Sequence, residues 1–279
     1  MIDETETVLF ARSGAVAIIT LNRPEQRNAV NGTLAEELRK AVIRFESDAS
    51  LRVAILTGQG RTFCAGMDLA AFLEGQGDAI LFGEGRFAGF VDAERSKPII
   101  AAVEGAAIAG GMELTLACDM IVAGTSAYFG LPEVAVGIFP VAGGAFRLAR
   151  KIPPAKAMQV CLTAQRISAQ EGLAFGLVNE LVPDGEALTK AMILAECIAR
   201  NASRAVEAAY TINRRVALKN EAEMWALSEE LWGPSQVQLT HLRVLRPSKR
   251  NANLCGQTKR QIHEASKSGL SSPQVLGHF

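Results

Sequence analysis

Four short apolar runs, rich in β-branched or small residues, constrain the fold of this chain most strongly. They span 15–21 (AVAIITL), 53–58 (VAILTG), 98–105 (PIIAAVEG) and 120–124 (MIVAG). Each run is short for a buried helix and is bounded by turn residues, so each is predicted to be a strand. Their nearly continuous apolar character indicates strands that are largely buried.

Helical patterns separate these strands. Residues 33–36 (TLAE) fit a capping box, which predicts the start of an amphipathic helix. Residues 110–119 (GGMELTLACD) predict a short helix between the last two strands. This alternation of strands and helices predicts an α/β fold. The apolar face of the first helix is predicted to consist of Leu34, Leu38, Ala41, Val42 and Phe45.

Three segments differ from this alternation. Residues 72–95 carry five glycines and predict a mobile loop or a loosely packed helix. From about 184 to 232 the pattern is helical without proline, which predicts a helical subdomain or an oligomer interface. Residues 235–279 hold seven Lys or Arg against one acid and are rich in Ser, Gln and Asn. This basic tail is predicted to be weakly structured.

The overall composition argues against several classes of protein. The formal net charge is zero, which argues against nucleic acid or an anionic membrane as a partner. No run approaches about 18 uninterrupted apolar residues, so no membrane span is expected. The acidic start (MIDETETVLF) lacks the features of a signal peptide. The five scattered cysteines indicate reduced thiols and therefore a cytoplasmic protein.

The histidines limit the chemistry further. His241, His263 and His278 all lie near the C-terminus, so the first 240 residues contain no imidazole. This excludes a Ser-His-Asp or Cys-His site and a His-ligated metal in the main body. The cysteines show no zinc spacing, so no metal site is predicted. Any acid–base chemistry in the first 240 residues must therefore use carboxylates, Lys, Tyr or Cys.

Three local patterns together point to chemistry. Residues 61–69 (RTFCAGMDL) and 104–114 (EGAAIAGGMEL) place small residues where a helix begins, which leaves backbone N–H groups uncovered. Two such groups aimed at one point form an oxyanion hole for a carbonyl oxygen. Glu113 and Glu133 lie in apolar sequence, where an isolated carboxylate is costly. They are candidates for a proton donor and a proton acceptor.

Taken singly, these features have ordinary structural explanations. Glycine-rich turns between strand and helix are common, and a lone Glu in an apolar helix often caps the helix or pairs with Arg. Cys64 and Cys118 are typical of small core residues rather than nucleophiles. The joint order and spacing of the patterns favour the functional interpretation.

In this order the motifs resemble the crotonases, the enoyl-CoA hydratase/isomerase superfamily. The resemblance covers about residues 8–234. It implies a spiral of repeated ββα turns, with C-terminal helices that assemble homotrimers or dimers of trimers. It also implies an acyl-CoA thioester substrate and no metal or redox cofactor. The motifs that carry it are 21–30 (LNRPEQRNAV), 61–69, 104–140 and 167–183 (ISAQEGLAFGLVNELVP).

The resemblance also implies roles for individual residues. Met67 and Gly110 match the positions whose backbone N–H groups hold the thioester oxygen. Glu113 and Glu133 match the paired catalytic acids of the hydratases, and their separation of 20 residues is that of the hydratase subgroup. Glu113, ionised, is expected to deprotonate a water molecule, and Glu133 to deliver a proton to the α-carbon. Burial and mutual repulsion are expected to keep one of them protonated near neutral pH.

Other positions match contacts with the substrate or coenzyme A. Ala65 lies where the family exposes a backbone group to the adenine, and the turn formed by Arg23, Arg27 and Asn28 is expected near the nucleotide end. Val141 replaces a glycine whose N–H helps to hold the water in many hydratases. The remaining candidate contacts are Gly66, Asp68, Leu69, Gly111 and Pro132.

The chain departs from the family pattern from Ser235 onward. The implied organisation is a catalytic core over 1–200, a helical region over 201–234 and an atypical basic tail over 235–279. A frameshifted or aberrant C-terminus is the preferred explanation of the tail. It puts in question the contacts that this region of the family makes with the phosphates of coenzyme A.

The sequence therefore predicts an enoyl-CoA hydratase-like lyase, in which water adds across the 2,3 double bond of an acyl-CoA thioester. One alternative is an enoyl-CoA isomerase or a dehydratase of a functionalised acyl-CoA. An alternative from another class is a non-catalytic scaffold that binds acyl-CoA, or RNA through the basic tail. The acyl group is not fixed, although Phe82, Phe87 and Phe90 are expected to shape its pocket.

Overall fold

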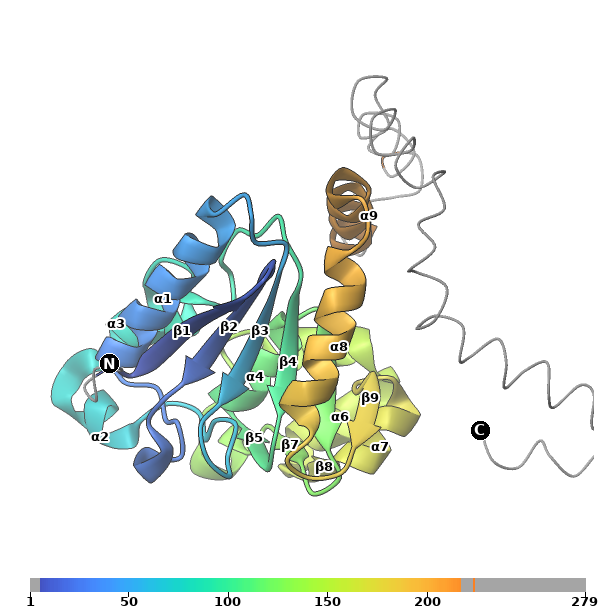
Figure 1. The fold of residues 1–279 in the computed structure, drawn as a ribbon. Helices are drawn as coiled ribbons and strands as arrows, with labels where there is room; N and C mark the ends of the chain where they lie inside the picture. Colours follow the sequence, from blue (N-terminus) through green and yellow to red (C-terminus); the bar gives the residue numbers. More distant parts are fainter. Residues whose placement is uncertain (1–5, 217–222, 224–279) are drawn as a thin grey trace, which may run out of the picture.

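The computed structural model describes residues 6–216 and residue 223 (Figure 1). The basic tail over 235–279 lies outside the described residues, and so do Trp225 and Trp232. The predictions made for the tail, including its weak structure and its effect on coenzyme A contacts, therefore stay predictions.

A six-stranded sheet forms the centre of the molecule. Its first two strands are antiparallel and joined by a tight turn, and the other neighbours pair in parallel. The four predicted strands all lie in this sheet, so that prediction is confirmed. In order across the sheet, the strands are β1 (Val8–Ser13), β2 (Val16–Leu21), β3 (Val53–Gly58), β4 (Ile99–Val103), β6 (Met120–Gly124) and β9 (Glu180–Val182).

Helices cover both faces of this sheet, which explains why its strands are apolar throughout. Along β3, Ala54 and Leu56 pack into the core cluster that includes residues of α1 (Gly32–Ser47). The alternate residue Ile55 packs with alanines of α8 (Ala187–Ala199) on the opposite face (Figure 1). Full burial of an aliphatic side chain of this size stabilises the fold by about 1.5–3 kcal/mol. A two-sided core therefore requires apolar residues at successive positions.

Helix α1 corrects one sequence prediction. The five residues expected on its apolar face are all buried. Its N-cap is Asn31, however, two residues before the predicted N-cap Thr33, because the side chain of Asn31 accepts a hydrogen bond from the Leu34 N–H at 2.9 Å. Asn is a better N-cap than Thr. Glu36, expected to close the capping box, instead forms ion pairs with Arg39 and Lys40.

A second, three-stranded sheet runs beside the first, in the order β5 (Ala106–Ile108), β7 (Tyr128–Gly130) and β8 (Arg166–Ser168). In the middle of the chain, β4 and β6 lie in the large sheet, and each is followed by a strand of the small sheet (β5 and β7) and then by helical residues. Thus β4, β5 and α4 (Gly110–Ala117) form one turn of a ββα spiral. The predicted crotonase-like fold is confirmed. The next turn continues into η4 (Glu133–Val136), α5 (Gly144–Lys151), α6 (Pro154–Thr163) and α7 (Ala169–Phe175).

The glycine-rich segment is a chain of short helical pieces rather than one loop. Phe87 and Phe90 are buried in it, whereas Phe82 is 58% exposed. The pieces are α2 (Leu69–Ala71), a π-helical turn η2 (Phe72–Gln76), α3 (Gly77–Phe82) and η3 (Phe87–Gly89).

The C-terminal part of the described chain is helical, as predicted, but it is divided. Helix α8 ends at Ala199, and α9 (Ser203–Arg215) begins after an extended residue, Ala202. Asn201, a residue that favours turns, lies in this break. No residue of α9 is buried by the part of the chain that the structure describes. None of the described helices is long and apolar enough to cross a membrane.

Candidate active site

The segment that carries Met67 lies beside the start of α4, whose first residue is Gly110. The Val30 N–H donates to Gly66 O at 2.8 Å, and the Asp68 N–H donates to Val30 O at 2.9 Å, which fixes the strand-like segment around Met67. A Cβ built on Gly66 would lie 3.1 Å from the nitrogen of Gly110, so this segment lies against the start of α4. Within the described chain, no protein acceptor takes the N–H of either Met67 or Gly110.

Backbone strain supports this arrangement. Ala109, the residue before the helix, has φ +53° and ψ −125°, which is rare for a residue with a side chain. Its N–H donates to Gly130 O at 2.8 Å, which ties the start of α4 to strand β7. Strained residues of this kind concentrate at functional sites. The structure thus places the Met67 segment beside Gly110, and the role of their N–H groups as an oxyanion hole stays a prediction.

The glycines at the start of α4 are required by close packing. A Cβ on Gly111 would lie 2.1 Å from the carbonyl oxygen of Cys64, and a Cβ on Gly110 would lie 2.3 Å from Cζ of Phe87. Both distances are shorter than any side chain tolerates. The Gly-Gly pair therefore lets the helix start approach both neighbours.

Glu113 projects from the first turn of α4 and is 3% exposed. Its Oε1 accepts a hydrogen bond from the Gly144 N–H, at the start of α5, at 2.8 Å. A Cβ on Gly144 would lie 3.0 Å from this oxygen, so glycine suits the contact. One carboxylate oxygen of Glu113 is thereby anchored to the backbone.

Glu133 begins η4 and is 7% exposed. Its Oε2 is buried and has no hydrogen-bond partner among the described residues. A buried carboxylate oxygen without a partner is costly and calls for a water molecule or a ligand. The two predicted acids therefore differ, because Glu113 is anchored and Glu133 has an oxygen free for another group.

Burial raises the pKa of both acids. The pKa of Glu113 rises from 4.5 to about 7, first because the carboxyl is buried and then because the charge of Glu133 is close. Backbone N–H groups of Gly144 and Ala142 and the charge of Arg147 oppose this rise. Burial also raises the pKa of Glu133. Glu113 thus exchanges its proton near neutral pH.

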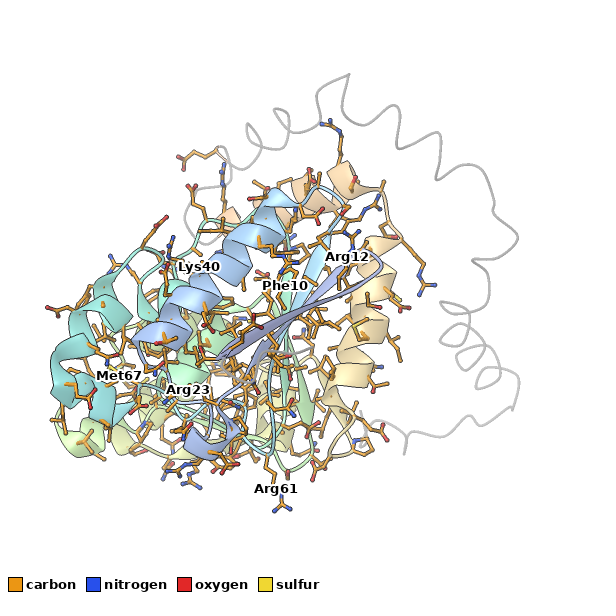
Figure 2. The ribbon with its side chains drawn as sticks, turned by 60° about the vertical axis from the view of Figure 1, so that its left-hand side comes forward. Phe10, Arg12, Arg23, Lys40, Arg61 and Met67 are labelled. Atoms are coloured by element: carbon orange, nitrogen blue, oxygen red, sulfur yellow. The ribbon has the colours of Figure 1, made fainter. Side chains whose placement is uncertain are left out.

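The residues expected near coenzyme A divide into two kinds. The Arg23 guanidinium donates to Asp68 at 2.9 Å, and Figure 2 shows Arg23 beside the Met67 segment. Asn28 is fully buried, and its side chain donates to the carbonyl oxygens of Gln59 and Thr62. Both side chains hold the turn together instead of facing solvent.

The other candidates lie nearer the surface. Arg27 and Leu69 are exposed, and Ala65 is half-buried, with its N–H donating to Arg27 O at 3.0 Å. Val141 is 42% exposed, and Pro132 lies directly before Glu133. A direct part in a reaction stays a prediction for each of these residues.

Sequence reasoning missed three features of this site. Gly144, whose N–H anchors Glu113, was visible only as part of a Gly-Gly pair. Phe87 was expected in the acyl pocket but not against Gly110. Cys161 lies on α6 close enough to both acids for their charges to raise the pKa of its thiol further, after burial. The sequence carried no signal for the position of Cys161.

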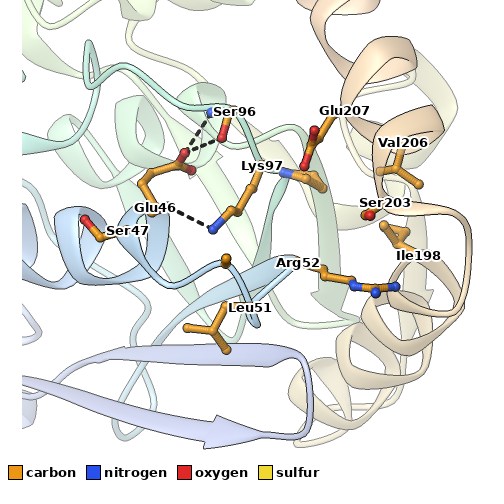
Figure 3. Close-up of a pocket in the computed structure, with 12 residues that line it drawn as sticks. Glu46, Ser47, Leu51, Arg52, Ser96, Lys97, Ile198, Ser203, Val206 and Glu207 are labelled. Carbon is orange, nitrogen blue, oxygen red and sulfur yellow. Dashed lines mark hydrogen bonds between the residues drawn. The ribbon is translucent and has the colours of Figure 1, made fainter. Parts of the chain in front are cut away.

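A separate cavity of about 250 Å³ lies between the C-terminal end of α1 and helices α8 and α9 (Figure 3). The buried Lys97 ammonium there donates to the carbonyl oxygens of Phe45, Glu46 and Asp48, which closes the end of α1. Glu46 in turn accepts hydrogen bonds from Ser96. These charges serve the fold, and neither candidate acid lines this cavity.

Within residues 6–216 and residue 223, no group of three or more His, Cys, Asp or Glu side chains is placed to hold a metal ion.

A ββα spiral of this kind is the fold of the crotonase class of proteins. The chain belongs to the enoyl-CoA hydratase/isomerase family, because the family's sequence model matches residues 11–238.

Relatives and solved structures agree with this assignment. The chain is 44% identical over 212 residues to carnitinyl-CoA dehydratase of Proteus mirabilis. This match covers 75% of this chain and 81% of the relative. It is 40% identical to enoyl-CoA hydratase EchA19 of Mycobacterium tuberculosis, over 80% of this chain and 86% of the relative. A crystal structure of enoyl-CoA hydratase from M. tuberculosis superposes with a TM-score of 0.79 at 39% identity, over 91% and 96% of the two chains.

Proposed function

We propose that this protein is an enoyl-CoA hydratase-like hydro-lyase, which adds water across the 2,3 double bond of an acyl-CoA thioester. The observation that carries the proposal is the pair of buried glutamates, Glu113 and Glu133, close to two unengaged N–H groups. The family membership and the relatives, which include both a hydratase and a dehydratase, support the same reaction class.

In the proposed reaction, the thioester oxygen accepts hydrogen bonds from the Met67 and Gly110 N–H groups. These donors stabilise the negative charge that develops as the thioester becomes enolate-like. Glu113, held at Oε1 by Gly144, takes a proton from a water molecule through its other oxygen. The water oxygen bonds to the β-carbon, the π electrons move toward the thioester, and Glu133 gives its proton to the α-carbon.

The proton balance requires one proton on the pair at the start of each cycle. Glu113 must be ionised and Glu133 protonated for hydration to begin. After hydration, Glu113 carries the proton and Glu133 is ionised. The raised pKa values of both groups suit this sharing, because burial disfavours two charges in one pocket. The roles belong to a coupled pair, so each observed pKa describes the pair.

We further propose that coenzyme A approaches along the 65–69 segment and the turn containing Arg27. The reaction needs no metal or redox cofactor, because carboxyl groups and backbone donors supply each step. The proposed location is the cytoplasm, and the proposed assembly is a homotrimer or a dimer of trimers. The exposed Phe139 and Phe146 support assembly.

A dehydratase of a functionalised acyl-CoA is a second candidate, since the chain is 44% identical to the carnitinyl-CoA dehydratase of P. mirabilis. Dehydration is the same reaction in reverse and uses the same two acids. An enoyl-CoA isomerase and a non-catalytic binding protein are also alternatives, but neither explains a second buried carboxyl group as directly.

The test is a turnover assay with short, long and branched 2-enoyl-CoA thioesters, 3-enoyl-CoA thioesters and carnitinyl-CoA. Hydration is measured by loss of the conjugated thioester absorbance and by mass spectrometry of the 3-hydroxyacyl-CoA product. The proposal expects this product from at least one 2-enoyl-CoA. Double-bond migration without hydration would support an isomerase, and acyl-CoA binding without turnover would support a scaffold.

A further inference from the structure

The ring of Phe87 packs against the backbone of Gly110. Phe87 is 1% exposed, and a Cβ added to Gly110 would lie 2.3 Å from Cζ and 2.6 Å from Cε1 of the ring. The ring edge therefore occupies the space where any other residue at position 110 would place its side chain. In the proposed function, the N–H of this same glycine holds the thioester oxygen.

The segment that carries Phe87 has an unusual backbone. Arg86 and Ala88 have positive φ angles of +56° and +59°, and Gly85 and Gly89 have φ angles of +76° and +62°. Positive φ costs about 1–3 kcal/mol for a residue with a side chain, so such a conformation persists only where its surroundings impose it. Positive backbone φ angles on both sides of Phe87 thus set the position of its aromatic ring.

Three contacts impose this conformation. A Cβ on Gly89 would lie 2.5 Å from Cβ of Arg39, so the segment is pressed against α1. The Asp92 N–H donates to Gly85 O at 2.9 Å and closes the loop. The Arg86 guanidinium pairs with Asp92 at 3.1 Å across the same closure.

A fourth contact connects this segment to the acid side of the site. The Arg147 guanidinium donates to Val91 O at 2.7 Å and to Ala142 O at 3.1 Å. Ala142 lies two residues before Gly144, whose N–H anchors Glu113. One arginine therefore joins the loop that carries Phe87 to the loop that holds the carboxylate, so the ring has a fixed position relative to both.

We propose that Phe87 is a specificity-determining residue that restricts the substituent on the α-carbon of the substrate. The inference rests on the proposed function and deepens it. The α-carbon is bonded to the thioester carbonyl carbon, so a substituent on it lies next to the oxygen that Gly110 holds. A rigid ring beside Gly110 leaves room for hydrogen at the α-carbon and excludes a methyl group. The substrates are thus enoyl thioesters without a branch at C2.

The test compares kcat/KM for but-2-enoyl-CoA and 2-methylbut-2-enoyl-CoA in the wild type, Phe87→Leu and Phe87→Ala. The ratio of the two values is independent of the fraction of folded protein, so loss of stability does not affect it. Phe87→Leu keeps most of the volume and is informative if Phe87→Ala does not fold. Phe45→Leu, a fully buried phenylalanine in the same core, is the matched control.

The wild type is expected to favour the unbranched substrate. Phe87→Leu is expected to raise the relative kcat/KM of the 2-methyl substrate by about tenfold, the range for one methyl group in an apolar pocket. Phe45→Leu is expected to leave the ratio unchanged. An unchanged ratio in Phe87→Leu, with the wild type active, would overturn this inference alone. A wild type that hydrates no 2-enoyl-CoA would overturn the proposed function and this inference with it.

Discussion

At the scale of single residues, Glu113 combines burial, an anchored oxygen and a neighbouring acid. An ionised carboxylate in such a place is costly unless donors compensate for its charge. The Gly144 N–H and the more distant Arg147 compensate in part, and the pKa still rises to about 7. The carboxyl of Glu113 is therefore suited to accept and release a proton near neutral pH.

This raised pKa predicts a pH-dependent stability. The folded carboxyl of Glu113 keeps its proton up to about pH 7, whereas the unfolded one releases it near 4.5. The free energy of unfolding should therefore fall as pH rises through this window, by about 3 kcal/mol at most. Glu113→Gln should remove this dependence.

The measurement is the Tm of the wild type and of Glu113→Gln at several pH values between 5 and 8. The Tm of the variant, relative to wild type, should increase with pH. A difference that is constant over this range would show that Glu113 titrates normally in the folded protein.

The sequence identified these acids but not their supports. Glu113 and Glu133 stand out as carboxyl groups in apolar sequence within a recognisable motif. The role of Gly144 depends on a contact between residues 31 positions apart, and Asn28 reads as an ordinary turn residue although it is fully buried. Such contacts depend on how the spiral brings its turns together, which no local pattern encodes.

At the scale of elements, the start of α4 supplies one of the two N–H groups proposed to stabilise negative charge on the thioester oxygen. Gly110→Pro removes one N–H and places atoms against Phe87, so we expect a loss of about 3 kcal/mol of transition-state stabilisation. Met67→Ala keeps its N–H and should be milder. Steady-state kinetics with but-2-enoyl-CoA compare the two variants. Abolished activity in Met67→Ala together with a tolerated Gly110→Pro would contradict the assignment of the oxyanion hole.

The sequence predicted the longer strands that are buried on both faces of the sheet. Strands β3 and β6 match their predicted bounds because apolar runs end there in glycine. Strands β5, β7 and β8 have three residues each, too few for a periodic pattern. The capping prediction for α1 failed because Asn31, a better N-cap than Thr33, lies two residues upstream of it.

At the scale of the whole molecule, unpartnered apolar surface predicts assembly. Val136, Ile138, Phe139 and Phe146 are 76%, 57%, 64% and 52% exposed. Burial of such surface between copies of the chain favours association. Size-exclusion chromatography with light scattering should give three or six times the chain mass of 29.7 kDa. A mass of one chain at micromolar concentration would contradict the proposed trimer.

The central claim is that two carboxyl groups share the proton transfers of hydration. Its most direct test is the kcat of Glu113→Gln and Glu133→Gln with but-2-enoyl-CoA, at saturating substrate. Glutamine keeps the shape of the side chain but cannot exchange a proton in this way. Glu104→Gln is the control, because Glu104 accepts a hydrogen bond from the Ala187 N–H outside the acid pair.

Each of the two acid variants should lose about 10²–10⁴-fold in kcat, as expected for removal of a general acid or base. Their secondary structure, measured by circular dichroism, and their affinity for a saturated acyl-CoA should stay close to wild type, and Glu104→Gln should retain most activity. Near-normal turnover by either Glu113→Gln or Glu133→Gln would contradict the account.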